Sequence, residues 1–558
     1  MAARPSGASS AGVGRARSAG AGRAARPSSF DRARILAPAA ALAQAAPAGK
    51  PDPGRGGEGG VSGTRRLAAQ VAGSAGVQVW LAFLGIFTTP FILRGLGAAA
   101  YGIFALVSVV SAHLSNLELG FGHATVRYLA RARAAGDRPG EQAILDTSLA
   151  VFLAGGIVAG SVLFTAARFL ATSFFHVPAG LQAAAVTAFR LGAVILLASF
   201  LGSFFSASLQ ALGRFDWLNG SRAVFGTAAA LGAVGTVALG GGLSAVFAVQ
   251  TAVSVTSCVV LGFAIVRLRR AGLRPRVDRG ALREMAGFGF VLFLAGIAYQ
   301  WMVNGPPVVL AARVSTAEIP SFSIPHTILQ KLAMLVASAS VVFFPFASAA
   351  SADADRTRLA AVFRSHLRLT FLVMAPIATY LAVFARPLLS AWVSPDFART
   401  AAPCLQVLAF AALVLALSGP PADVARALGR PRWVLVYTTS VAVLGVGLSL
   451  LLVSSYRAFG VALAVLLSLA LATVPLLVAV ARRLLDLGPA ALAGALARPL
   501  VAVALAGAAW LAAAEALEGV LAALVAGAVV TSAYAAGTAA WVLESRERAS
   551  LRAALPIA

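Results

Sequence analysis

Apolar residues fill the chain in long runs, and short polar segments separate each run from the next. From Leu67 onward the runs repeat at about 20 residues, the length that an α-helix needs to cross the hydrocarbon core of a bilayer. The pattern predicts fourteen membrane spans, at residues 70–93, 100–123, 143–167, 184–210, 222–240, 244–266, 286–311, 321–347, 366–390, 401–425, 433–453, 459–481, 499–517 and 520–543. Proline lies inside several spans, as at Pro90, Pro345 and Pro376, where we expect kinks that membrane helices tolerate.

Composition supports this membrane class. Of the 558 residues, 59% are hydrophobic and only 12% are charged, whereas soluble domains carry about 25% charged residues. The low charge excludes an ordinary soluble enzyme, and the high hydrophobicity excludes a disordered chain. The two cysteines, Cys258 and Cys404, lie far apart in apolar runs. We interpret them as small apolar side chains, not as a disulfide or a metal site.

The first 66 residues have a different composition. They are rich in Ala, Gly, Pro, Ser and Arg and show no apolar period, so we expect a basic, disordered N-terminal tail over residues 1–66. No methionine lies between Met1 and Met285. A start codon at Val61 is therefore the alternative to a translated tail.

The charge balance fixes the expected topology. The chain has 45 Lys and Arg against 20 Asp and Glu, a formal net charge of +25, which in a soluble protein would suggest a nucleic-acid partner. With a cytoplasmic N-terminus, 37 of the basic residues fall on the cytoplasmic side and 6 on the other. Basic residues are retained in cytoplasmic loops. We therefore predict a multi-pass protein with both termini cytoplasmic, and no nucleic-acid partner.

A short internal repeat predicts two related halves. Residues 211–217 (ALGRFDW) follow the fourth predicted span, and residues 427–433 (ALGRPRW) follow the tenth, with five of seven positions identical. An offset of six spans gives both halves the same orientation, with a pseudo-two-fold axis along the membrane normal. The expected domains are an N-terminal six-helix bundle (67–266), a basic cytoplasmic connector (267–285), a C-terminal six-helix bundle (286–481), two extra transmembrane helices (482–543) and a cytoplasmic tail (544–558).

Several of these segments carry a family resemblance. Residues 91–104 (FILRGLGAAAYGIF), 117–122 (LELGFG) and 127–130 (RYLA) resemble the first hairpin of polysaccharide flippases, and residues 392–397 with 427–430 fit the second half. The chain is thus similar to the oligosaccharide-flippase branch of the multidrug/oligosaccharidyl-lipid/polysaccharide exporter superfamily, over roughly residues 67–485. The resemblance implies an all-α fold of two six-helix bundles around a central cavity. It also implies flipping of an undecaprenyl-pyrophosphate-linked oligosaccharide across the bacterial inner membrane by alternating access.

Two other functions stay open from the residues alone. A drug/cation antiporter of the same superfamily is the alternative, and a membrane polysaccharide polymerase or ligase is disfavoured because the outside loops are too short for a catalytic domain. The chain has neither a Gly-Lys-Ser/Thr phosphate loop nor a Cys/His cluster. We therefore expect no enzymatic activity, no cofactor and no metal. The expected partners are an anionic lipid-linked glycan, the bilayer, and polysaccharide polymerase or assembly proteins.

Charged residues inside spans are the candidate substrate ligands, because a buried charge is costly unless it faces a cavity or a partner. Lys331, Arg190 and Arg127 are candidates for attracting the pyrophosphate. Arg190 has the alternative of reaching the membrane interface, and Arg127 that of anchoring the topology. Gln300 and Asn304 stand where related flippases often carry an acidic residue. They are candidates for binding sugar hydroxyls.

A second set is predicted to couple or gate the movement. Glu118 precedes a Leu-Gly pair in the second span and is a candidate protonatable gate. Asp423 is a second candidate, although a local ion pair with Arg426 is the simpler interpretation. Pro306 and Pro307 are expected to break the seventh span, which would make that segment the moving element.

Overall fold

The protein is described by a computed structural model covering residues 59–115, 121–175, 177–269, 272–352, 355–516, 519–538 and 541. The described part of the chain is helical and contains no strand. This confirms the predicted all-α class. The N-terminal tail lies almost entirely outside the described residues.

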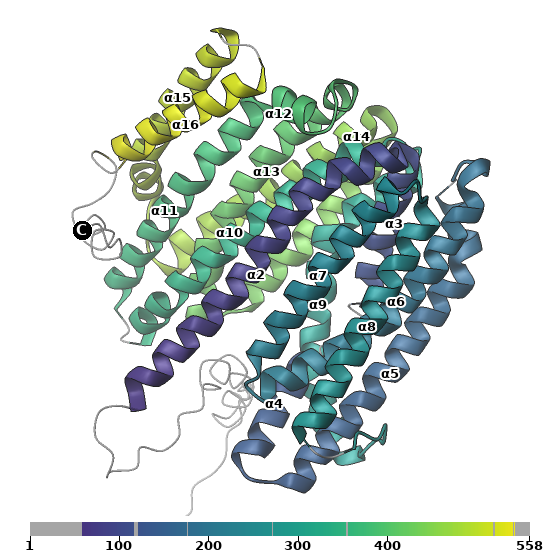
Figure 1. Cartoon of the computed structure of the whole chain (residues 1–558). Coiled ribbons are helices and arrows are strands. Elements are labelled where there is room, and N and C mark those ends of the chain that lie inside the picture. Colours follow the sequence, from purple (N-terminus) through teal and green to yellow (C-terminus); the bar gives the residue numbers. More distant parts are fainter. Residues whose placement is uncertain are drawn as a thin grey trace, which may run out of the picture. The chain divides into compact units, whose positions relative to one another are not determined.

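The helices follow the predicted apolar runs (Figure 1). Those preceding the connector are α2 (Gly59–Leu96), α3 (Ala98–Ser115), α4 (Phe121–Ala134), α5 (Arg138–Phe169, extended by the π-helical turn Leu170–Phe174), α6 (Ala179–Ala211), α7 (Phe215–Ala238) and α8 (Leu243–Arg269). Those following it are α9 (Arg279–Arg313), α10 (Ile319–Ala352), α11 (Arg356–Val383), α12 (Ala385–Trp392), α13 (Pro395–Ala427), α14 (Arg432–Leu484), α15 (Pro489–Ala516) and α16 (Val520–Gly537).

Within the described residues, nine helices are long and apolar enough to cross a membrane. The count of fourteen spans therefore stays a prediction. Two of the predicted spans, 433–453 and 459–481, lie in the single helix α14, which is interrupted at Arg457, where φ is 49° and ψ is −130°. The predicted span 366–390 is divided between α11 and the short helix α12.

Two large apolar clusters form the interior. The first joins buried residues between Ala100 and Ile319, mostly from α3 to α8. The second joins buried residues between Val309 and Leu485, from α9 to α14. Helices α15 and α16 pack on each other and on the outside of α11 and α12, as the yellow pair in Figure 1 shows.

The repeated ALGR sequence ends its two helices in the same way. At the end of α6 the N–H of Arg214 donates to Leu209 O over 2.9 Å, and at the end of α13 the N–H of Arg430 donates to Ala425 O over 2.8 Å. Gly213 and Gly429 have φ of 71° and 67°, the left-handed conformation that glycine adopts most readily and that this type of helix cap requires. The repeat thus encodes a matching pair of helix ends.

Candidate functional site

Lys331 lies on α10, about 18 Å along the helix axis from its first residue. Its side chain is exposed on the protein surface and forms no ion pair with any described residue. A lone ammonium group about a third of the way along a long apolar helix needs water or an anion beside it. The structure therefore keeps Lys331 as a candidate ligand for an anionic group.

The two candidate arginines of the N-terminal half have aromatic neighbours. The guanidinium group of Arg190 on α6 lies 5.1 Å from the ring centroid of Phe164 on α5, and that of Arg127 on α4 lies 5.5 Å from the ring of Tyr128. Arg190 is exposed and Arg127 is half-buried. These contacts stay within the N-terminal half, whereas Lys331 lies in the other half, so a cationic site shared by the three residues stays a prediction.

The seventh predicted span does not break where we expected. Helix α9 runs from Arg279 to Arg313 through Pro306 and Pro307. Both prolines are buried, and a Cβ placed on Gly445 of α14 would lie 3.6 Å from the Pro306 ring. Close packing on α14 supports the helix where the two prolines lack N–H donors. The expected break is therefore wrong.

The two predicted polar ligands on α9 remain candidates for binding sugar hydroxyls. Gln300 and Asn304 are one helical turn apart and so share a face. Gln300 is 8% exposed, and its amide nitrogen has no hydrogen-bond partner among the described residues. A buried amide without a partner is unfavourable. Gln300 is thus available to a ligand that reaches this face.

A buried ionisable cluster surrounds Asp423 on α13. Asp423 is 1% exposed and accepts a hydrogen bond from Arg426 of the same helix, so the expected local ion pair is present. His366 of α11 places Nδ1 3.7 Å from the second carboxylate oxygen, and Phe343 stacks on the imidazole ring at 4.2 Å between ring centroids. Asp423 therefore faces a second titratable group, which the sequence interpretation missed.

The two halves meet closely at the end of α2. Arg94 Nε donates to Val393 O over 2.7 Å, and the indole N–H of Trp392 donates to Ile86 O over 2.7 Å. Gly102 of α3 lies against the α9–α10 loop so tightly that a Cβ there would overlap the carbonyl oxygen of Thr316. The two hydrogen bonds join segments about 300 residues apart in sequence, and together the contacts close this end of the interface between the halves.

At the opposite end the connector is bonded to α5. The Asp146 carboxylate accepts from the N–H of Arg274 over 3.0 Å, and Thr147 Oγ1 accepts from the N–H of Asp278 over 3.0 Å. Asp278 in turn caps α9, its carboxylate accepting from the N–H of Ala281 over 2.8 Å. The connector and the start of α9 are thus held to the N-terminal half.

The sequence signals for these residues are weak. Arg94 stands out only as part of a motif, and Asp146 and His366 are single polar residues at or inside predicted spans. The partners of Asp146 and Arg94 lie 128 and 299 residues away, and the partner of His366 is on another helix. The hydrophobic periodicity of a sequence does not show such long-range contacts. Glu118 lies outside the described residues.

Comparison with solved structures defines the fold. The chain superposes on the lipid II flippase MurJ in an inward closed conformation with a TM-score of 0.67 and 12% identity, covering 83% of this chain and 97% of that one. An inward-facing multidrug resistance MATE family transporter of the MOP superfamily gives 0.64 and 14%, with 71% and 92% coverage. Its outward-facing counterpart gives 0.53 and 14%, with 74% and 93% coverage. The chain has the fold shared by MurJ and these MATE family transporters.

The sequence comparison gives the family. Residues 92–402 match the family described as "Polysaccharide biosynthesis protein". The chain belongs to that family, and this confirms the predicted resemblance. No curated protein sequence matches the chain.

Proposed function

We propose that the chain flips an undecaprenyl-pyrophosphate-linked oligosaccharide across the bacterial inner membrane, with both termini cytoplasmic and no enzymatic activity. The observation that carries the proposal is Lys331, an exposed ammonium group without an ion-pair partner in the described residues, about a third of the way along α10. Membership of the polysaccharide biosynthesis family and the transporter fold support it.

Recognition in this proposal rests on charge first and hydrogen bonds second. Lys331 attracts the pyrophosphate as a point charge, and Arg190 and Arg127 contribute further positive potential. Gln300 and Asn304 on α9 offer amide donors and acceptors to sugar hydroxyls. The apolar chain of the carrier lipid stays in the bilayer, so only the headgroup needs a polar path.

The movement in this proposal is alternating access between the two halves. The contacts of Arg94, Trp392 and Gly102 close the end that the loop charges predict to be extracytoplasmic. That arrangement suits a state that loads substrate from the cytoplasmic leaflet. Opening this end and closing the other would release the headgroup outside. Pro306 and Pro307 are the places where α9 bends most easily, because each removes a backbone hydrogen bond.

Coupling in this proposal uses Asp423 with His366. Two ionisable groups 3.7 Å apart in a buried setting interact strongly, and a proton taken up or lost there changes the charge of the cluster. Arg426 completes the cluster and is itself 45% exposed, which gives it a route to water. Glu118 is the proposed coupling candidate of the other half.

Transport by Lys331 variants tests the recognition step. In proteoliposomes holding a fluorescent polyprenyl-pyrophosphate glycan, Lys331→Ala should reduce flipping to the rate of empty liposomes, and Lys331→Arg should keep most of it. Arg313→Ala removes an exposed charge from α9 outside the candidate set and is the matched control. Wild-type flipping by Lys331→Ala would overturn the assignment.

The same proteoliposomes distinguish glycan-lipid flipping from the alternative function, drug/cation antiport. Lys50 and Lys331 are the only lysines of the chain, so an amine-acetylating reagent reports on Lys331 with Lys50 as its internal reference. We expect the glycan lipid to protect Lys331 and a cationic dye to leave it unprotected. Transport of the dye without flipping of the glycan lipid would favour the drug/cation antiporter and contradict our proposal.

A gradient assay tests the coupling step. Asp423→Asn and His366→Gln should keep glycan-lipid protection of Lys331 while making flipping insensitive to an imposed proton gradient. Gln406→Glu, elsewhere on α13, is a control that changes the charge of this helix without touching the pair. Unchanged gradient dependence in both variants of the pair would exclude it from coupling.

A further inference from the structure

A pocket of about 280 Å³ lies between α6, α7 and α8 of the N-terminal half. Each of these helices is long and apolar enough to cross a membrane, so we expect the pocket to lie at membrane depth. Its lining includes five serines, one arginine and no acidic residue. The rest of the lining is apolar. Hydroxyls and a guanidinium group facing hydrocarbon are unfavourable, so their presence here favours a ligand with a polar group.

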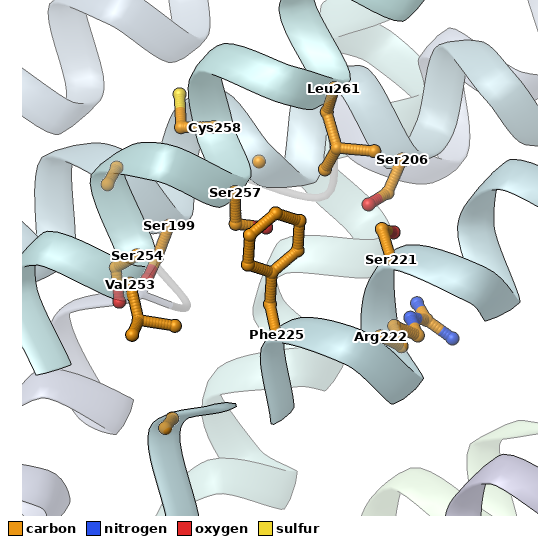
Figure 2. A pocket seen from close by; sticks show the side chains of 13 residues that line it. Ser199, Ser206, Ser221, Arg222, Phe225, Val253, Ser254, Ser257, Cys258 and Leu261 are labelled. Carbon is orange, nitrogen blue, oxygen red and sulfur yellow. The ribbon is translucent and has the colours of Figure 1, made fainter. Parts of the chain in front are cut away.

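Each of the three helices contributes two of the polar side chains. Ser199 and Ser206 lie on α6, Ser221 and Arg222 on α7, and Ser254 and Ser257 on α8. Figure 2 shows Ser206 and Ser221 on the same side of the pocket as Arg222, with Phe225 reaching into the middle towards Ser257. Three helices thus contribute hydrogen-bonding groups to a single space.

Several of these hydrogen-bonding side chains have no partner inside the described part of the protein. Ser199 and Ser221 donate to carbonyls of their own helices, over 2.8 Å to Ile195 O and 3.0 Å to Leu218 O. The side chains of Ser206, Ser254, Ser257 and Arg222 make no hydrogen bond or ion pair within the described residues. Most serines inside membrane helices bond to their own backbone, so three free hydroxyls in one pocket indicate a place for a ligand.

The position of the cation indicates which ligand. Arg222 lies about 10 Å along α7 from its first residue, at the end of the bundle that the loop charges predict to be cytoplasmic. The serines continue from there, reaching about 18 Å from the same end of α6 at Ser199. A guanidinium group near the membrane surface with hydroxyls beyond it matches a phosphate group and its oxygens. Basic pockets between membrane helices on this side are suited to anionic lipid headgroups.

We propose that this pocket, with Arg222 at its cytoplasmic end and the free hydroxyls of Ser206, Ser254 and Ser257 within it, binds the phosphate-bearing headgroup of an anionic membrane lipid. Arg222 pairs with a phosphate oxygen, and the hydroxyls bond the remaining phosphate oxygens or the headgroup hydroxyls. The proposal does not depend on glycan flipping: none of the candidate substrate or coupling residues lines this pocket. The headgroup belongs either to a bulk phospholipid or to a polyprenyl carrier.

Native mass spectrometry of the full-length protein tests the site with four probes: phosphatidylglycerol, phosphatidylcholine, undecaprenyl pyrophosphate and inorganic phosphate. We expect Arg222→Gln to weaken retention of the bound phosphate lipid about tenfold, the effect of losing one charge-assisted contact. Gly202 lines the pocket, and a Cβ there meets nothing within 4 Å. Gly202→Phe should therefore fill the space without a backbone clash and abolish retention.

Matched controls separate the pocket from general charge or helix effects. Arg267→Gln removes an exposed arginine from the same end of α8, and Gly235→Phe adds the same ring to an open site on α7; both should retain lipid within about twofold. Preference for phosphatidylglycerol identifies a phospholipid site, and preference for undecaprenyl pyrophosphate identifies a carrier-lipid site. Unchanged retention in Arg222→Gln and Gly202→Phe would overturn the proposal, as would equal losses in the controls, phosphatidylcholine bound as tightly as phosphatidylglycerol, or retention of free phosphate alone.

Discussion

The two ends of the interface between the halves are held by different kinds of contact. At the end of α2, Arg94 and Trp392 bond to backbone carbonyls across the interface, and Gly102 lies against the backbone of Thr316. At the other end, the ion pair between Arg131 and Glu284 joins α4 to α9 at 3.4 Å, with side chains 75% and 54% exposed.

This contrast indicates which end is firmly closed in this state. Contacts to backbone carbonyls and a glycine without room for a side chain fix geometry, whereas an exposed ion pair contributes about 1 kcal/mol or less. The connector adds further bonds at the second end, where Asp146 and Thr147 hold it and the N-cap of α9 to α5. We therefore expect substitutions at the α2 end to change the opening equilibrium most.

The largest effect is expected from Gly102→Val. The added side chain would overlap Thr316, and overpacking of this kind costs about 1–3 kcal/mol. This cost destabilises only the state in which the α2 end is closed. Ile324 is 2% exposed beside Leu93 and Val393, so alkylation of an Ile324→Cys reporter measures opening. We expect alkylation at least about tenfold faster. Gly85→Val on α2, where a Cβ meets nothing within 4 Å, should leave the rate unchanged; equal acceleration there would refute the closed-end assignment.

Arg94→Ala should have the next largest effect. It removes a charged donor from the carbonyls of Val393 and Trp392, and a hydrogen bond to a charged group is worth about 1.5–3 kcal/mol. Alkylation of the Ile324→Cys reporter should become about tenfold faster, because the interface opens more often. Trp392→Phe loses a single neutral donor and should show a smaller increase. If Trp392→Phe exceeded Arg94→Ala, the guanidinium group would not be the main contact.

Asp146→Ala should act at the other end and in a different way. It leaves the N–H of Arg274 without its acceptor, at a cost of about 1–3 kcal/mol. Hydrogen exchange of residues 272–278 should accelerate, while the Ile324→Cys reporter stays at the wild-type rate. Asp146→Asn keeps an acceptor oxygen and is the control. A faster reporter would show that the two ends are coupled through the connector.

The smallest effect is expected from Arg131→Gln. Because the pair with Glu284 is largely exposed, its loss should change thermal stability by about 1 kcal/mol or less. The change should disappear at high salt, where such pairs are screened. A salt-independent loss of several degrees in the melting temperature would mean that this end is held as firmly as the α2 end.

The sequence was informative where local rules decide the structure. Apolar runs predicted where the helices lie, and the ALGR repeat predicted equivalent places that prove to share a helix cap at Gly213 and Gly429. The sequence was misleading where tertiary packing overrides the local helix propensity. Pro306 and Pro307 should break an isolated helix, yet α9 continues because α14 packs against them.

The candidate sites were predictable only one residue at a time. Lys331 stood out because charge is rare inside a span, and Asp423 because it follows two prolines and precedes Arg426. His366 gave no such signal, since its meaning comes from Asp423 on another helix. The serines of the α6–α8 pocket are ordinary in membrane helices until three faces are brought together.

Helix α9 has a mechanical consequence for any opening of the molecule. Its 35 residues make a beam about 52 Å long, with its first turns fastened beside α5 and its remainder packed along α14. A tilt of about 10° at one end would sweep the other through about 9 Å. Pro306 and Pro307 each remove a backbone hydrogen bond within this helix, so bending of α9 would concentrate there, while the bonded connector moves with α5.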